Sequence, residues 1–246
     1  MPLTERAICT RIMMQGFRDA CLEADTTVTG GQTVLNPWPM IGGVATSIVR
    51  EGEFVPSDGA QVGDVVVLTK ALGTQVAVNV HEWRTLLNER WTKCQSDAQL
   101  TVEQAEDMMH QAVCSMARLN RHASAIMVPH QAHAATDVTG FGILGHAQNL
   151  MDHQQEAVGM ELQKLPLIRG TQAVNDNVLN FRLTVGYSAE TSGGLLICMP
   201  AEQAPKYIAE LQRLEPDSPQ AWIVGRIVAD PNRKAKIRED CQFLQV

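Results

Sequence analysis

The sequence predicts an α/β or α+β fold, because stretches typical of strands alternate with stretches typical of helices from about residue 60 to the C-terminus. A short apolar run at 65–68 has the composition of a buried strand. Thr101 and Gln104 have the spacing of a capping box, and apolar residues recur behind them every three or four positions. With 246 residues and 45% hydrophobic content, the chain can form one large domain or two smaller ones.

The first 50 residues predict one helix and two strands. Apolar residues at helical spacing predict an amphipathic helix at 3–24, with Thr4 as its N-cap. β-branched residues predict one strand that ends at the Gly30-Gly31 turn and a second strand at 42–49. These elements are too few to close a core, so the segment is expected to belong to an incomplete domain or to pack on the rest of the chain.

A segment rich in Gly, Pro, Ser and Asp near 50–62 predicts a domain boundary. We place it so that residues 1–58 are the remnant of an N-terminal domain and residues 59–246 are a C-terminal α/β domain. In the second domain, composition and periodicity predict helices at 72–83, 101–126, 143–150 and 204–214, strands at 65–68, 158–163, 195–199 and 221–228, a strand ending at 137, and a polar loop at 88–99. The charged tail after Asp230 is expected to add a short strand.

Charge and composition exclude several classes of partner. A formal net charge of −7 argues against a nucleic-acid partner, which would require a basic face. No apolar run approaches the roughly 20 residues of a membrane-spanning helix, and the first residues lack the layout of a signal peptide. The six cysteines are scattered without a C-x-x-C pair, as expected of reduced thiols. We therefore expect a cytoplasmic protein that contacts neither membrane nor nucleic acid.

Residues 135–150 contain the strongest candidate for a functional site. Asp137 ends a predicted strand and is followed by the glycine-rich turn TGFG at 139–142 and by a helix. Glycines let a backbone approach a ligand closely, and a helix N-terminus presents N–H groups to an anion. Because Asp137 would repel a bare phosphate, these residues favour Mg²⁺ held between the carboxylate and phosphate oxygens. The alternative is that Asp137 caps the helix and the glycines merely allow tight packing.

Three stretches, in this order, resemble motifs of selenophosphate synthetases (selenide, water dikinases), members of the aminoimidazole ribonucleotide synthetase-like superfamily. They are TVTGGQTVLNPW at 27–38, TDVTGFGILGHA at 136–147 and ETSGGLL at 190–196. The resemblance implies a two-domain fold whose first domain pairs its sheet across a homodimer, with ATP between the domains. The family's N-terminal segment, which carries the catalytic Cys or selenocysteine and a Lys, has no counterpart before Met1. We therefore expect an N-terminally shortened member with an incomplete dimerisation and ATP-binding domain and no catalytic nucleophile of its own.

The resemblance also implies roles for particular residues. Asp137 matches the family's Mg²⁺ ligand, and Gly30, Gly31, Gln32 and Thr33 match its ATP-contacting loop. From the residues alone, GGQT would be a plain turn between strands. The glycine pair of ETSGGLL is expected to set close packing beside the site.

The activity that the resemblance implies is ATP-dependent synthesis of selenophosphate from selenide, with AMP and phosphate as the other products. Mg²⁺ is the implied metal, and K⁺ is a further candidate ion. We expect this chain alone to be inactive, since it lacks most of the family's catalytic residues. Two other hypotheses are a non-catalytic dimerisation or interaction partner, and a superfamily relative that acts on another substrate with ATP.

Overall fold

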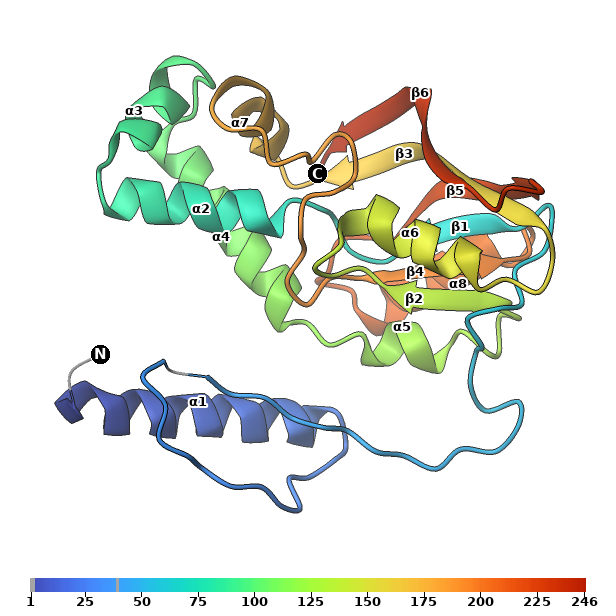
Figure 1. Cartoon of the computed structure of the whole chain (residues 1–246), viewed down its shortest axis with the longest axis horizontal. Coiled ribbons are helices and arrows are strands. Elements are labelled where there is room, and N and C mark those ends of the chain that lie inside the picture. Colours follow the sequence, from blue (N-terminus) through green and yellow to red (C-terminus); the bar gives the residue numbers. More distant parts are fainter. Residues whose placement is uncertain (1–2, 39) are drawn as a thin grey trace. The chain divides into compact units, whose positions relative to one another are not determined.

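The computed structural model describes residues 3–38 and 40–246 and divides the chain into two compact units (Figure 1). We call them the N-terminal unit (Met1–Arg50) and the C-terminal unit (Glu51–Val246). The division falls eight residues before the predicted domain boundary, which stays a prediction. Each unit is described by itself.

The N-terminal unit contains the predicted helix but not the predicted strands. Helix α1 covers Leu3–Glu23, so Thr4 lies within it rather than at its N-cap. The described residues from 24 to 50 form no helix or strand, and the expected strands before Gly30 and at 42–49 are wrong for this chain. A strand is stable only when its backbone pairs with a neighbour, and a β-branched composition cannot supply that neighbour.

The C-terminal unit is built on one six-stranded mixed sheet, in the order β2-β4-β1-β5-β3-β6 (Figure 1). All neighbouring strands pair antiparallel except β3 and β6, which pair parallel. This arrangement confirms the α+β class. The strands are β1 (Val65–Leu68), β2 (Ala134–Asp137), β3 (Val158–Leu167), β4 (Leu195–Met199), β5 (Trp222–Ala229) and β6 (Ala235–Gln245).

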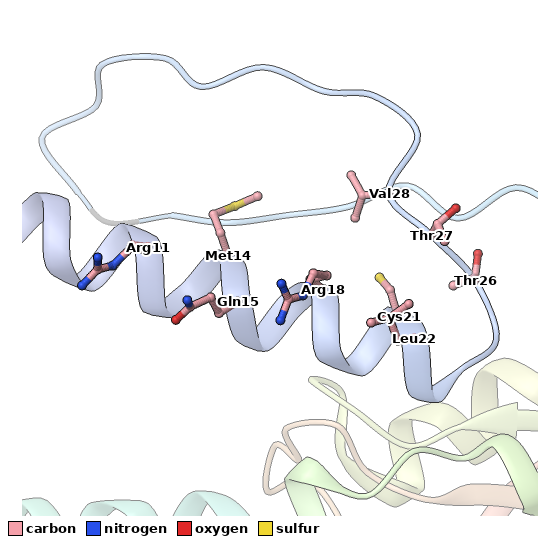
Figure 2. Close-up of a pocket in the computed structure, with 9 residues that line it drawn as sticks. All are labelled: Arg11, Met14, Gln15, Arg18, Cys21, Leu22, Thr26, Thr27 and Val28. Carbon is pink, nitrogen blue, oxygen red and sulfur yellow. The ribbon is translucent and has the colours of Figure 1, made fainter.

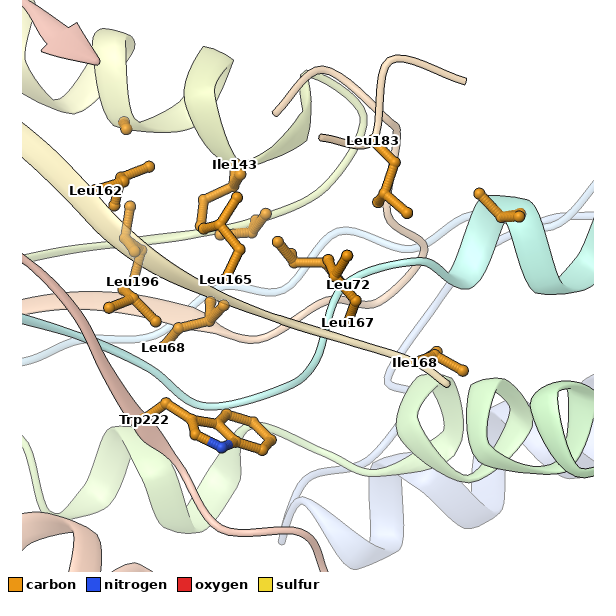
Figure 3. Packing of buried hydrophobic residues seen from close by; sticks show 14 of the residues in the cluster. Leu68, Leu72, Ile143, Leu162, Leu165, Leu167, Ile168, Leu183, Leu196 and Trp222 are labelled. Carbon is orange, nitrogen blue, oxygen red and sulfur yellow. The ribbon is translucent and has the colours of Figure 1, made fainter. Parts of the chain in front are cut away.

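Helices cover both faces of this sheet. The side chains of Val66 and Leu68 belong to a large core shared with α2, α4 and α6, whereas Val67 belongs to a smaller core shared with α5 and α8. Figure 3 shows Ile143 of α6 projecting toward the strand that carries Leu162 and Leu165. The helices are α2 (Thr74–Thr85), α3 (Glu89–Ser96), α4 (Val102–Ala117), α5 (Arg121–Ala125), α6 (Gly142–Asp152), α7 (Thr171–Asn177) and α8 (Ala204–Leu214).

Two predicted elements of this unit are wrong. The polar run at 88–99 is not a loop: Asn88 caps α3 by accepting from the N–H groups of Arg90 and Trp91, and the helix buries Trp91. The helix that begins after Thr101 has the predicted capping box, but it ends at Ala117 rather than continuing to 126. The break is stabilised from outside the helix, because the Lys70 ammonium donates to the carbonyls of Ser115 and Arg118.

Candidate functional site

Asp137 is the last residue of β2, an edge strand of the sheet, and pairs with Leu195 of β4. Its side chain is exposed. Among the residues that the structure describes, none forms a hydrogen bond or ion pair with its carboxylate. Asp137 therefore presents both oxygens to a ligand from a rigid strand end.

The loop that follows Asp137 is held by a histidine from the next helix. The Nε2 atom of His146, on α6, accepts from the backbone N–H of Thr139 at 3.0 Å and from that of Phe141 at 3.4 Å. The Thr139 hydroxyl lies 3.2 Å from the same nitrogen. Burial lowers the pKa of His146, while the nearby Asp137 carboxylate raises it. An imidazole that accepts through Nε2 is neutral and carries its proton on Nδ1.

Asp137 does not cap α6, which rules out the simpler explanation of its position. The N-cap residue is Phe141, and no side chain caps this end of the helix. Two of the N–H groups expected to be free are also used: those of Gly142 and Leu144 donate to the carbonyls of Thr139 and Gly186. The start of α6 is thus partly satisfied from within the chain, and the Asp137 carboxylate takes no part in these bonds.

Gly142 has a steric role at the start of α6. Its φ is +70°, and a Cβ atom there would lie 2.5 Å from the Gly186 carbonyl oxygen. An L-residue would therefore be strained in its backbone and would collide with the neighbouring segment. Gly140 has open space instead, since a Cβ atom added to it would meet no heavy atom within 4 Å. The tight packing expected of the glycines is found at Gly142, and the open approach at Gly140.

The ETSGGLL stretch supports the loop from its other side. The Glu190 N–H donates to the carbonyl of Thr139, and the Val138 N–H donates to that of Gly194. A Cβ atom on Gly193 would collide with the Val138 carbonyl, so the expected close packing of this glycine pair is found. Hydrogen bonds thus connect the Asp137 loop to the ETSGGLL stretch.

Glu190 connects the ETSGGLL stretch to α2. Its buried carboxylate accepts from the N–H groups of Gly73 at 2.7 Å and Thr74 at 3.0 Å, and from the Thr74 hydroxyl at 2.5 Å. Gly73 is the N-cap of α2 and offers no side chain, so Glu190 replaces the missing cap. Burial raises the pKa of Glu190 to about 7, against the opposing effect of its hydrogen bonds.

Lys70 connects the ETSGGLL stretch to the end of α4. Its Nζ donates to the carbonyls of Ser115, Arg118 and Ser192, which ties the end of α4 to the ETSGGLL stretch. Burial, and then the charge of Arg118, lower the pKa of Lys70 to about 8. Sequence reasoning missed Lys70 and Glu190 because neither lies near its partners in the chain.

The other predicted site residues lie in the N-terminal unit. Gly30, Gly31, Gln32 and Thr33 are all exposed, and a Cβ atom on either glycine would meet no heavy atom within 4 Å. Gly31 has a φ of +141°, which favours glycine. A pocket of about 550 Å³ lies between α1 and residues 26–28, just before this loop. Arg11 and Arg18 are among the residues that line it (Figure 2). The Arg18 side chain pairs with Asp19 at 2.7 Å.

The residues around Asp137 fit a metal only in the presence of other ligands. No group of three or more His, Cys, Asp or Glu side chains that could hold a metal ion occurs in the described part of the chain. Mg²⁺ is commonly held by one or two carboxylates, with phosphate oxygens and waters as its other ligands. A single exposed carboxylate at a strand end fits such a phosphate-bound ion, and does not fit an all-protein metal cage.

Fold and site together define an α+β domain with a candidate metal and phosphate site at the end of an edge strand. The chain belongs to the family described as AIR synthase related protein, C-terminal domain, which matches residues 61–238. Residues 3–38 and 40–246 include no helix with the length and apolar content needed to cross a membrane.

Within this family, the chain is similar to selenide, water dikinases. The chain is 50% identical over 244 residues to "Selenide, water dikinase 2" of Homo sapiens, covering 98% of this chain and 53% of that protein. It is 48% identical over 252 residues to "Selenide, water dikinase" of Trypanosoma brucei brucei (strain 927/4 GUTat10.1), covering 100% of this chain and 63% of that protein. The chain thus spans between half and two thirds of the length of these relatives. The resemblance to selenide, water dikinases is confirmed.

Solved structures support the fold alone. A thiamine-monophosphate kinase from Stenotrophomonas maltophilia K279a superposes with a TM-score of 0.51 at 19% identity, covering 77% of this chain and 54% of that one. Escherichia coli HypE, a hydrogenase maturation protein, superposes with a TM-score of 0.50 at 16% identity, covering 75% of this chain and 48% of that one.

Proposed function

We propose that this chain contributes the Asp137 metal-binding loop to ATP-dependent selenophosphate synthesis. In that reaction selenide, ATP and water give selenophosphate, AMP and phosphate. The observation that carries the proposal is the exposed carboxylate of Asp137 at the end of β2, which has no hydrogen bond or ion pair with any residue that the structure describes, within a chain 50% identical to a selenide, water dikinase. Asp137 would coordinate a Mg²⁺ ion whose other ligands include phosphate oxygens of ATP, and K⁺ is a further candidate ion.

The residues of this chain bind and orient rather than react. Phosphoryl transfer depends mainly on positioning and on stabilisation of charge, and a bound Mg²⁺ supplies charge neutralisation at the phosphate oxygens. Asp137 would bind the metal ion. The loop that follows Asp137 is fixed by hydrogen bonds to His146, Gly194 and Glu190. Gly30 to Thr33, which are all exposed residues, would contact ATP through their backbone N–H groups. We assign no nucleophile to any of the six cysteines.

We further infer a cytoplasmic homodimer that forms through residues 27–50. This segment leaves large apolar side chains in water, with Val44 96% and Ile48 99% exposed. A second copy that pairs with this segment would cover these side chains and satisfy its backbone. The same observation favours a second candidate function, in which the chain is a non-catalytic dimerisation or interaction partner.

Calorimetric titration with ATP, with and without Mg²⁺, tests the proposed site in the unchanged chain and in Asp137→Asn. We expect binding of ATP only with Mg²⁺, and a loss of about ten- to a hundredfold in affinity in the variant, the usual effect of removing a charge-assisted contact. Asp217→Asn is the matched control, since Asp217 is an exposed carboxylate of the same unit, in the turn after α8. Equal affinities in all titrations would contradict the proposed site.

A further inference from the structure

His146 is the common acceptor of the loop that connects Asp137 to α6. The residue is 7% exposed, and its ring packs against that of Phe141, with ring centroids 5.2 Å apart. One ring nitrogen, Nε2, lies within hydrogen-bonding distance of two backbone N–H groups and one hydroxyl, all from Thr139 and Phe141. The imidazole thus replaces the carbonyl acceptors that a regular element would provide.

The remaining contacts of this loop cannot replace His146. The N–H group of Val138 donates to the carbonyl of Gly194. The N–H groups of Gly142 and Glu190 both donate to the carbonyl of Thr139. None of these bonds uses the N–H groups of Thr139 or Phe141. Without His146, the N–H groups of Thr139 and Phe141 would lose their acceptor, and the loop would shift toward conformations in which water replaces it.

We propose that His146 is a positioning residue for Asp137. It holds the turn at 139–141 in the shape that leaves the Asp137 carboxylate free to reach a phosphate-bound cation. Residues that orient a metal ligand, without touching the metal, commonly change metal affinity by ten- to a hundredfold when replaced. The proposal rests on the proposed function, because it assumes that Asp137 binds the cation of Mg²⁺–ATP.

Three variants separate positioning from simple stability. His146→Leu keeps an apolar side chain and removes the acceptor, and His146→Gln places an amide oxygen near the position of Nε2. His130→Gln is the matched control, since His130 is also a buried histidine, but its Nε2 pairs with Glu210 on α8 at 2.7 Å. Each variant is first melted, and all measurements are made well below its transition.

Two readouts are needed: hydrogen exchange of the Thr139 and Phe141 amides by NMR, and calorimetric affinity for Mg²⁺–ATP. In His146→Leu we expect exchange of both amides to accelerate about tenfold and affinity to fall about tenfold. His146→Gln should recover most of both, and His130→Gln should change neither by more than about twofold. An unchanged chain that binds no Mg²⁺–ATP would overturn the proposed function. Normal exchange or normal affinity in His146→Leu, in a chain that does bind, would overturn this inference alone.

Discussion

The glycine-rich motifs of the two units have different physical causes. In the C-terminal unit, Gly142 and Gly193 are required by neighbours that a Cβ atom would strike. In the N-terminal unit, Gly30 and Gly31 have open space around them. Close packing within the folded chain explains why glycine is needed at Gly142 and Gly193. It does not explain why glycine stands at Gly30 and Gly31. A glycine motif therefore indicates ligand binding only where close packing does not already require the glycines.

The units also differ in how they treat apolar side chains. Leu68 and Leu196 are fully buried between sheet and helices, while Leu35 is 95% exposed and Ile48 is 99% exposed. A helix such as α1 makes its backbone hydrogen bonds internally, but a strand needs a partner. The N-terminal unit therefore keeps its helix and loses its predicted strands.

Substituting glycines in both units should give the largest contrast in stability. Gly142→Ala combines a positive φ with a collision against the Gly186 carbonyl, and should lower the free energy of unfolding by about 3 kcal/mol. Gly30→Ala meets open space and should change it by less than about 0.5 kcal/mol. Chemical denaturation of both variants provides the measurement. Similar losses would show that the two glycine motifs do not differ as described.

The pH dependence of stability should identify Glu190 as a brace of the C-terminal unit. Its folded pKa, about 7, lies above the ordinary value of 4.5, so the folded chain holds a proton that the unfolded chain releases between these values. The resulting stability is fully present below pH 4.5 and is lost as pH rises through about 7. Between pH 5 and pH 7 it should fall by about 2 kcal/mol, at up to about 1.4 kcal/mol per pH unit.

Glu190→Gln should flatten this dependence, because the amide does not titrate. Denaturation midpoints of both proteins across this pH range provide the measurement. Parallel curves for the two proteins would show that folding does not raise the pKa of Glu190.

Self-association of the chain should depend on the exposed apolar residues of the N-terminal unit, and not on the exposed apolar residues of the C-terminal unit. Light scattering at micromolar concentration is expected to give twice the monomer mass for the unchanged chain. Val44→Ser with Ile48→Ser should shift it toward the monomer, with little effect on the melting of the C-terminal unit. Val62→Ser, at a position 61% exposed in the C-terminal unit, is the control. A monomeric unchanged chain would count against dimerisation through residues 27–50.

Several features that depend on neighbouring residues were predictable from the sequence, although the Asn88 cap of α3 was missed, and features that depend on distant residues were not. The capping box of Thr101 and Gln104 is local and is present. The Glu190 cap of α2 joins residues 116 and 117 positions apart, and no short pattern encodes it. His146 lies only seven residues from Thr139, and its place inside TDVTGFGILGHA was the available signal. The strand end at Asp137 was predictable because β2, the turn and α6 follow one another directly.

A crystal structure of this chain with Mn²⁺, in place of Mg²⁺, and a non-hydrolysable ATP analogue would show whether Asp137 binds the metal ion of the nucleotide. The anomalous signal of Mn²⁺ locates the ion independently of the nucleotide. We predict an ion about 2.1 Å from a carboxylate oxygen of Asp137, with phosphate oxygens among its other ligands. A nucleotide bound with its ion held elsewhere, and with the Asp137 carboxylate still free, would contradict the account.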